Sequence, residues 1–470
     1  MYKTFIPLNE NINKDIRENI LEITDLFQNS GKEIYLVGGS VRDIFLGKEP
    51  KDYDLCTNAK PEEIKEILKD KVIIDTGIKH GTVTVIYKGK NSVITPFEIT
   101  TYRCDGLYKD GRHPESVEFV NTLEEDLKRR DLTVNAMAYD VKTENIICID
   151  EQPFDDAYVG IIRTVGKAED RYNEDALRML RTFRFAAQLG FTIEPETFEA
   201  VKKCAPLISK VSKERIREEL TKILMSDNPQ ALELMCVSGL EQYLFDGTTP
   251  ITDCLYCEHK NQWHYTDVFH HTMDVVKRVP KKFELRWAAL FHDLGKPVVR
   301  ALKEGTTGTY TYYGHPVESV KIAENIMNIL KFSNQQKDII LKYVKYHDES
   351  LAEVKISTFK RIMNDISNFK DYMELRKADT MAHRLLAGTK YALDQITKIY
   401  ERYIKVINDN AAFTIKDLNI NGYDIMELGF EGKEIGDCLK YLLEQVLSEN
   451  VQNEFDDLLK LAKDYRTSLK

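Results

Sequence analysis

The spacing of apolar residues changes along this chain, and that change constrains the fold more than any other feature. Up to about residue 140, short runs rich in β-branched residues alternate with Gly, Asn and Lys turns, which predicts one sheet. From about Glu174 onward, apolar residues recur every three or four positions, which predicts helices. We therefore expect an α+β protein with an N-terminal mixed α/β head on one sheet, followed by all-α parts. The head is expected to contain a helix over 12–27 and strands over 33–37, 53–56, 72–75, 82–87 and 91–102.

The length of the chain requires more than one hydrophobic core. A chain of 470 residues exceeds the size at which single cores stop growing. Hydrophobic residues make up 43% of it, which rules out a largely disordered protein. Changes of pattern and Pro or Gly breaks divide it into four expected parts: a head over 1–142, a helical neck over 143–225, a helical domain over 226–405 and a helical tail over 406–470.

Charge and hydropathy exclude several classes of protein. Lys and Arg total 66 against 76 Asp and Glu, so the chain is no histone-like polycation, and a nucleic-acid partner must meet a local basic patch. No stretch approaches the roughly 18 apolar residues that span a bilayer, so no membrane partner is expected. The eight scattered cysteines do not form the dense framework of a secreted disulfide protein. We expect a cytoplasmic protein with reduced thiols.

A glycine turn in the head has the pattern of a phosphate-binding turn. In LVGGSVRD at 36–43, an apolar strand runs into Gly38-Gly39 and then into a helix start, with Arg42 close to the same turn. Glycines let backbone N–H groups approach a phosphate because no Cβ stands in the way. A double glycine alone is more often a plain turn, so the neighbouring residues have to decide.

Two carboxylates follow that turn in a strand-like run. The period of two places Asp52 and Asp54 on one face of the strand, while Tyr53 points to the other. Two surface acids at a solvated strand edge are the commoner fate of such a pair. A divalent-cation site that neutralises two repelling charges is the alternative. The strand, the double glycine, Arg42 and the acid pair within 36–54 together favour the cation site.

Basic residues gather at two further places. At the first place, Arg129 and Arg130 stand with the acidic Asp131 immediately before an apolar segment. In EDALRMLRTFRF at 174–185, arginines at intervals of three form one basic helix face, with Asp175 a further turn back: Arg178, Arg181 and Arg184. The opposite side of this helix is apolar: Leu177, Leu180, Phe183 and Phe185. The basic face is either solvated or an anion-binding wall.

These motifs together resemble the class II tRNA nucleotidyltransferase and poly(A) polymerase family. The similar segments, in order, are VGGSVRD with KDYDL, FEITTYR, DGRHPESVEF, DLKRRDLTVNAMA, IIRTVG and EDALRMLRTFRFAAQLGF. VSKERIREEL at 211–220 and the tail at 417–446 are similar to the bacterial CCA-adding branch. Where the family usually shows Asp-Pro-Phe-Gly-Gly, this chain has Asp150-Glu-Gln-Pro-Phe-Asp-Asp156.

The resemblance implies an enzyme that adds C, C and A to a tRNA 3′ end from CTP and ATP. It makes Asp52 and Asp54 the catalytic Mg²⁺ ligands of a two-metal nucleotidyl transfer. Glu98, in an extended segment, is a candidate third carboxylate, and an ordinary strand-surface Glu is the alternative. Triphosphate and ribose contacts fall on Gly38, Gly39, Arg42, Arg130 and Asn135. The selection of CTP and ATP falls on Glu174, Asp175 and Arg178, with Arg181 and Arg184 in phosphate contacts or support. By the same resemblance, 103–117 is a flexible loop and the tail grips the tRNA body.

A second cluster resembles the HD phosphohydrolase superfamily. Its residues are His271, His292, Asp293 and Asp379, which in that superfamily hold a divalent transition metal or Mg²⁺; His315 and His347 extend them toward a second metal. Single histidines are often structural, but seven of the ten in the chain lie between 259 and 347. The resemblance implies phosphatase or cyclic phosphodiesterase activity on tRNA ends. Cys254, Cys257 and His259 suggest zinc only weakly, because no second Cys/His pair follows at zinc-finger spacing.

Two other functions remain compatible with the sequence. An A-adding enzyme or a bacterial poly(A) polymerase uses nearly the same motifs. A protein of another class, an HD metal phosphohydrolase whose head only binds nucleotide, is also possible. The intact acid pair at Asp52 and Asp54 argues against this second alternative, because a binding module has no need of two carboxylates facing a polyanion.

Overall fold

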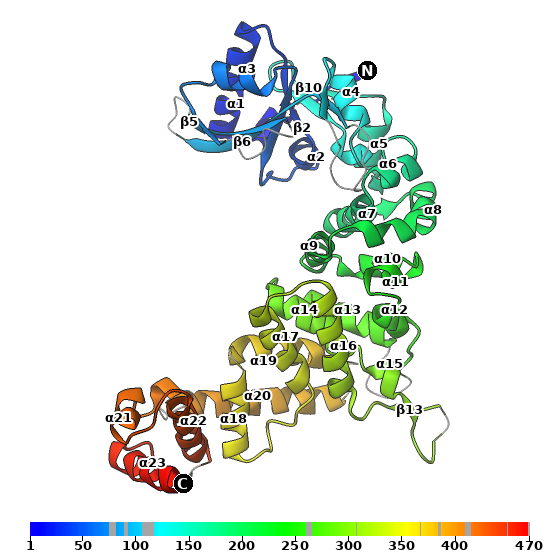
Figure 1. Ribbon diagram of the computed structural model, residues 1–470. Coiled ribbons are helices and arrows are strands. Elements are labelled where there is room, and N and C mark those ends of the chain that lie inside the picture. The colour runs from blue at the N-terminus through cyan, green and yellow to red at the C-terminus, as the bar shows by residue number, and fades with distance from the viewer. Residues whose placement is uncertain are drawn as a thin grey trace. The chain divides into compact units, whose positions relative to one another are not determined.

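The computed structural model describes residues 1–74, 81–88, 93–105, 117–259, 266–306, 308–366, 368–383, 387–408, 415–448 and 450–468. The chain forms two compact units, Met1–Thr249 and Pro250–Lys470, which are described separately (Figure 1). No helix in the described ranges is long and apolar enough to cross a membrane.

One eight-stranded sheet forms the centre of the head. Its order is β1 (Tyr2–Phe5), β10 (Asn145–Cys148), β9 (Ala138–Asp140), β2 (Ile34–Val37), β3 (Tyr53–Thr57), β6 (Ile94–Thr101), β5 (Thr82–Lys88) and β4 (Val72–Ile74). Strands β3 and β6 run parallel, and every other neighbouring pair is antiparallel. The five expected strands are confirmed over these bounds. Residues 75, 91 and 92 of the expected strands lie outside the described residues.

The sequence did not predict the strands β1, β9 and β10, which complete one side of the sheet. They are three or four residues long, and β1 alternates only between exposed and half-buried positions, so they carry little periodic signal. The expected first helix is α1 (Lys14–Asn29), which buries Ile20, Ile23 and Phe27. The other head helices are α2 (Gly39–Phe45), α3 (Pro61–Ile67) and α4 (Leu123–Lys128). A small ribbon of β7 (Arg103–Asp105) and β8 (Val117–Phe119) flanks residues 106–116, so most of the expected flexible loop lies outside the described residues.

Helices follow the sheet in the first unit, as the apolar spacing predicts. They are α5 (Gln152–Val159), α6 (Ala168–Glu174), α7 (Leu177–Leu189), α8 (Pro195–Cys204), α9 (Lys213–Leu224), α10 (Leu232–Val237) and α11 (Glu241–Leu244). Helix α7 packs against α9. The strands β11 (Ile161–Ile162) and β12 (Thr192–Ile193) pair in parallel beside them. Here Asp155 and Asp156, at the positions of the family's double glycine, belong to helix α5.

Among its described residues, the second unit is helical apart from one short hairpin, β13 (Ala301–Leu302) with β14 (Tyr310–Thr311). Its helices are α12 (Pro250–Leu255), α13 (Val268–Arg278), α14 (Phe283–Phe291), α15 (Lys296–Val299), α16 (His315–Ile329), α17 (Asn334–Tyr346), α18 (Ile356–Asp365), α19 (Phe369–Met381), α20 (Ala387–Asn408), α21 (Gly422–Glu427), α22 (Lys433–Leu447) and α23 (Phe455–Ser468). Trp287 lies in the core, in ring contact with Phe283, Phe291 and Phe332. The last three helices contribute to a separate apolar cluster around Leu442 and Leu458.

Candidate active site and candidate metal centre

The parallel pairing of β3 with β6 brings a third carboxylate to the predicted acid pair. Asp54 and Glu98 are direct partners in the register, so their side chains share one face of the sheet. Asp54 is half-buried, Asp52 is exposed just before the strand, and Tyr53 is buried. Burial raises the pKa of Asp54 to about 6, together with the charges of Glu98 and Asp52 and against that of Arg130. These head carboxylates (Asp52, Asp54 and Glu98) repel one another, and a cation would relieve that repulsion.

The glycine turn places backbone and guanidinium groups together. Gly38 adopts φ +71°, a left-handed conformation that favours glycine, and a Cβ there would lie 3.2 Å from Nη1 of Arg130. Arg42 is buried and donates to the side-chain oxygen of Asn135. Arg130 donates to the backbone oxygen of Asn135 at 3.4 Å. The turn residues Gly38 and Gly39 and these three side chains, predicted from distant motifs, therefore meet at the start of α2.

A buried carboxylate holds the two arginines of the RRD motif. Asp126 is fully buried and accepts from Arg129 at 2.7 Å and from Arg130 at 3.0 Å. Burial raises the pKa of Asp126, but the two guanidinium groups outweigh burial and the net pKa is lowered. Asp126 is thus charged and fixes the direction of Arg130. The sequence indicates this role only in part: Asp126 precedes Arg129 by three residues and Arg130 by four, which is the spacing of neighbours on a helix.

The three arginines of α7 are each paired with a carboxylate, rather than lying on an open basic face. Arg178 bonds to Glu174, and Arg181 lies 2.6 Å from Asp131. Arg184 lies 2.6 Å from Glu219 on α9. Arg178 and Arg184 are only 8% exposed, so the solvated reading of this face is wrong for them. Buried guanidinium groups require such partners, and the partners come from other elements.

Asp175 differs from its expected position one turn back on the helix. It lies between α6 and α7 with extended backbone angles (φ −139°, ψ 105°). Its side chain accepts the N–H of Leu177 at 3.0 Å and a hydrogen bond from Arg215 at 2.8 Å. An Asp side chain that satisfies a free N–H at a helix start competes with the helical conformation of its own residue. Asp175 is therefore held by Arg215 of α9, a partner that the sequence did not indicate.

Phe185 also departs from the expectation that it lies opposite the arginines. Its ring centroid is 3.9 Å from the guanidinium carbon of Arg184 and 5.5 Å from that of Arg181. Arg42 approaches the same ring at 5.1 Å. Position 185 is four residues after 181, so the helix places the two on neighbouring parts of one face. Phe185 thereby connects the glycine-turn arginine with two arginines of α7.

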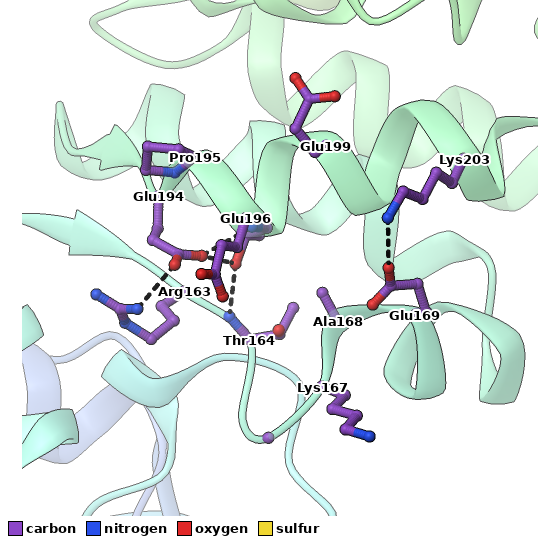
Figure 2. Close-up of a pocket in the computed structure, with 12 residues that line it drawn as sticks. Arg163, Thr164, Lys167, Ala168, Glu169, Glu194, Pro195, Glu196, Glu199 and Lys203 are labelled. Atoms are coloured by element: carbon purple, nitrogen blue, oxygen red, sulfur yellow. Dashed lines mark hydrogen bonds and ion pairs between the residues drawn. The ribbon is translucent and has the colours of Figure 1, made fainter.

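A pocket of about 430 Å³ lies beside β11 and the start of α8 (Figure 2). Arg163 and Glu194 form an ion pair of 2.9 Å in its wall, and Lys203 and Glu169 form another of 3.1 Å. None of the predicted site residues lines it. Its charged groups are largely occupied with one another, so we do not assign it a substrate.

The second unit brings the four HD-type residues into one buried cluster. We call His271, His292, Asp293 and Asp379 the histidine cluster. Oδ2 of Asp293 lies 3.5 Å from Nε2 of His271 and 3.2 Å from Nε2 of His292. Oδ1 of Asp379 lies 3.0 Å and 3.9 Å from the same nitrogens. Within the described ranges, every group of three or more His, Cys, Asp or Glu side chains whose ligand atoms all lie within 4.8 Å of one another belongs to this unit. The three head carboxylates therefore lie farther apart than the ligand atoms of these groups.

The atoms of the histidine cluster fit a divalent cation. Nδ1 of His292 lies 2.7 Å from the backbone oxygen of Ala289, which orients Nε2 toward the carboxylates. Among the described residues, neither oxygen of Asp293 nor Nε2 of His292 makes a hydrogen bond of good geometry, although all are buried. Burial alone would raise the pKa of Asp293. The neighbouring His292 and Lys296 outweigh burial, so the net pKa is lowered and the carboxylate is charged. Buried ligand atoms left in this state are those a metal would satisfy.

The sequence missed Lys296 and His383 beside the histidine cluster, and it indicated His259 only as a weak zinc candidate. The ammonium group of Lys296 lies 2.6 Å from Asp293 and 3.3 Å from Nε2 of His259. Burial lowers the pKa of His259 to about 3, together with the charge of Lys296. The ring of His383 stacks on His271 with centroids 5.4 Å apart. Lys296 follows Asp293 by three residues in the HDLGKP motif, and that spacing was the available signal.

The two cysteines weighed for zinc are buried. Burial raises the pKa of Cys257, which disfavours the thiolate that a metal requires. His259, their proposed companion, is in contact with Lys296. Residues 260–265 lie outside the described residues.

Comparisons with known proteins decide the family. The profile of the Poly A polymerase head domain matches residues 34–156, and that of a probable RNA and SrmB-binding site of polymerase A matches 190–252. A putative tRNA nucleotidyltransferase domain 2 matches 299–462. The CCA-adding enzyme of Ligilactobacillus salivarius is 38% identical over 365 residues, which cover 74% of this chain and 87% of that protein. The chain belongs to the CCA-adding enzyme family.

Members of this family are nucleotidyltransferases, and other relatives agree with the assignment. The CCA-adding enzyme of Geobacillus stearothermophilus is 41% identical over 294 residues, or 61% of this chain and 66% of that protein. The crystal structure of the Bacillus stearothermophilus CCA-adding enzyme in complex with CTP has a TM-score of 0.66 at 26% identity and covers 98% of both chains. The Thermotoga maritima CCA-adding enzyme complexed with tRNA_CCA, at 20% identity and a TM-score of 0.59 over the full length of both chains, shares the fold. The predicted fold class is thereby confirmed.

Proposed function

We propose that this enzyme adds C, C and A to the 3′ end of tRNA, using CTP and ATP. The observation that carries the proposal is that Asp54 on β3 and Glu98 on β6 share one face of the sheet. Arg130, which approaches Gly38 of the glycine turn, also lowers the pKa of Asp54, and Asn135 and Asp126 hold Arg42 and Arg130 in place. The relatives that match are CCA-adding enzymes, which favours CCA addition over A addition alone or poly(A) synthesis. A tRNA substrate also favours a cytoplasmic location.

The residues of the head divide between metal and nucleotide. Asp52 and Asp54, with Glu98 beside them, are the carboxylates that would hold Mg²⁺, and their mutual repulsion fits such a cation. The chemistry that Mg²⁺ would supply there is activation of the tRNA 3′ hydroxyl and neutralisation of charge on the departing pyrophosphate. The N–H of Gly38 donates to the backbone oxygen of Met137, so the N–H groups that would face the triphosphate are those at the start of α2, from Gly39 onward. Arg42 and Arg130, held by Asn135 and Asp126, supply fixed positive charge to the triphosphate oxygens.

Base selection is assigned to the start of α7. Asp175 offers carboxylate acceptors and Arg178 offers guanidinium donors, and together they match the hydrogen-bonding edge of a base. Arg215 holds Asp175, and Glu174 holds Arg178. Arg181 and Arg184, being occupied by Asp131 and Glu219, support this arrangement rather than face substrate directly. We retain the four-part division near 142, 225 and 405, with β10 (Asn145–Cys148) counted in the head because it pairs in the head sheet, and with the tail over 406–470 as the part that binds the tRNA body.

The decisive experiment supplies tRNAs that end before CCA, after C and after CC, each with CTP or ATP. A CCA-adding enzyme extends the first two with CTP and the third with ATP. Extension by ATP alone identifies an A-adding enzyme, and long adenylate tails identify a poly(A) polymerase. Failure to extend any of them leaves the head as a binding module.

The histidine cluster supports a second activity, a metal-dependent phosphohydrolase. The specific observation is the buried Asp293, whose oxygens lack hydrogen bonds of good geometry while the Nε2 atoms of His271 and His292 and an oxygen of Asp379 lie close together beside it. Imidazole and carboxylate ligands favour a divalent transition metal, with Mg²⁺ as the alternative. Phosphate monoesters and 2′,3′-cyclic phosphates at RNA ends are the substrates to test, with each metal supplied singly.

A further inference from the structure

Arg171 joins the helix before the proposed selection site to the head. It lies in the last turn of α6, and its side chain is 18% exposed. Nη2 of Arg171 lies 2.5 Å from Oε1 of Glu174, and Nη1 donates to the backbone oxygen of Lys128 at 3.2 Å. One guanidinium group thus contacts both a carboxylate of α6 and the end of α4.

Arg178 makes the same two kinds of contact with the other oxygen of Glu174. Its Nη1 pairs with Oε2 of Glu174, and its Nη2 donates to the backbone oxygen of Arg129 at 3.3 Å. Nη1 also donates to the backbone oxygen of Arg171 at 3.4 Å. The two arginines therefore share one carboxylate, with one arginine on each oxygen. We call Arg171, Glu174 and Arg178 the arginine clamp.

The arginine clamp holds the end of α4, from which the chain continues into the proposed catalytic site. Lys128 is the last residue of α4, and Arg129 is its C-cap. The last carbonyl groups of a helix lack partners within the helix, so donors from other elements satisfy them. Arg130 follows directly and lowers the pKa of Asp54. The clamp thus links Arg178 to the segment that carries Arg130.

The division of Glu174 between two arginines restricts where Arg178 can point. A guanidinium group matches a carboxylate best when two of its N–H groups bond to the two oxygens at once. Arg171 occupies Oε1, so Arg178 is confined to Oε2 and its Nη2 is left to Arg129. Without Arg171, Arg178 would be free to turn and take both oxygens of Glu174.

We propose that Arg171 is a positioning residue for nucleotide selection, which keeps Arg178 from closing on both oxygens of Glu174. The inference rests on the proposed selection of CTP and ATP at the start of α7, and it adds a residue that acts there through Glu174. A turned Arg178 loses the donors that distinguish one base from another. The head contacts to the triphosphate remain, so selectivity should fall more than affinity.

The competing account gives Arg171 a structural role alone, as an ion pair that holds α6 against the head. Loss of such a contact would lower stability, and it would lower addition of all four nucleotides by the same factor. The ratio between correct and incorrect nucleotides would then stay unchanged. This ratio separates the two accounts.

The experiment supplies the full chain with CTP or UTP on a tRNA that ends before CCA, and with ATP or GTP on one that ends after CC. We expect Arg171→Met to lower the ratio of kcat/KM for CTP over UTP by about five- to tenfold, while the KM for CTP changes by less than about twofold. Arg171→Lys retains the charge without the forked geometry and should give an intermediate ratio. Lys203→Gln is the matched control, because it removes the exposed ion pair with Glu169 on the same helix, and it should keep the wild-type ratio.

Two further measurements test whether Arg171 acts through Glu174. Added methylguanidinium should restore the ratio in Arg171→Ala, because a small cation can bind the vacated oxygen of Glu174. In a Glu174→Gln background, Arg171→Met should change the ratio little further, because the shared carboxylate is already gone.

Each outcome has a defined meaning. An unchanged ratio in folded Arg171→Met, with a wild type that adds C, C and A, refutes the positioning role and leaves the proposed function intact. An equal loss for all four nucleotides also refutes it. A wild type that does not discriminate among nucleotides overturns the proposed selection and this inference together. Should Arg171→Met fail to fold by circular dichroism, Arg171→Lys decides, since a wild-type ratio in that variant refutes the proposal.

Discussion

The head carboxylates and the histidine cluster, the two sites that we propose for phosphate chemistry, hold their charges in different ways. In the head, Asp52 is exposed, Asp54 is half-buried, and Glu98 arrives through strand register. In the second unit, His271, His292 and Asp293 are each at most 1% exposed. The head site is thus partly exposed to solvent, and its carboxylates repel one another. The histidine cluster compensates its carboxylates internally with Lys296 and imidazoles.

The difference shows in the direction of the pKa shifts. Burial and like charges raise the pKa of Asp54, whereas for Asp293 and Asp379 the effect of burial is outweighed by neighbouring cationic and imidazole groups that lower the pKa. A site whose ligands repel one another depends on its cation and substrate to become fully charged. A site whose ligands are already compensated is organised before either arrives.

The largest expected effect is the loss of nucleotide addition in the Asp52→Ala/Asp54→Ala variant. Removing both carboxylates removes the metal ligands, so addition should fall by on the order of a thousandfold or more. Binding of tRNA should remain, because these acids by themselves repel phosphate. Primer extension with radiolabelled CTP and a filter-binding assay measure the two quantities. Asp70→Ala, an exposed acid of the same unit, is the control; appreciable incorporation by the double variant would contradict the head assignment.

Next in size is the loss of hydrolysis in the His292→Ala/Asp293→Ala variant, with nucleotide addition retained. The variant removes two ligands of the histidine cluster, so metal-dependent hydrolysis of a phosphate monoester or a 2′,3′-cyclic phosphate should fall about a hundredfold or more. Addition should stay within about twofold because the two sites belong to different compact units. Loss of CCA addition in a folded variant would mean that the sites depend on each other.

A smaller effect is expected for base selection. Asp175→Ala should relax the preference for CTP and ATP over GTP and UTP by about ten- to a hundredfold, with less effect on triphosphate affinity. Arg215→Ala should do the same more weakly, because it releases Asp175 without removing the acceptor. Competition between nucleotides in single-turnover reactions gives the ratio, with exposed Glu218→Ala as the control. Equal loss for all four nucleotides would argue that α7 binds phosphate rather than the base.

The smallest effect concerns stability and pH. The pKa of the Asp54 carboxyl rises from 3.8 in the unfolded chain to about 6 in the folded protein. The folded protein therefore binds the proton at a higher pH than the unfolded chain does, and the charged carboxylate destabilises the folded state. The destabilisation is absent below about pH 4, grows between pH 4 and 6 and is complete above pH 6. Asp54→Asn should therefore raise the free energy of unfolding in metal-free buffer by about 1–2 kcal/mol at pH 8, after allowance for partial exposure. Urea titrations at pH 8 and pH 4.5 measure this, and an equal gain at both would refute it.

Much of the head could be predicted from sequence because its information is local. The five strands, the first helix, the turn at Gly38 and the acid pair all lie in short segments whose periodicity or residue type is sufficient. The adjacent His292 and Asp293 likewise indicate the histidine cluster, and the order of the motifs indicates the nucleotidyltransferase family. Short edge strands such as β1 were missed because three or four residues carry too little pattern.

What only the tertiary structure decided is which distant residues meet. No spacing in the sequence places Glu98 beside Asp54, since this follows from the parallel pairing of β3 and β6. The pairing of Asp175 with Arg215 depends on the neighbouring helix, and the facing nitrogens of His315 and His347 depend on how two helix ends pack around Gly295. Local propensity acts over a few residues, whereas these contacts are set by the packing of whole elements against one another.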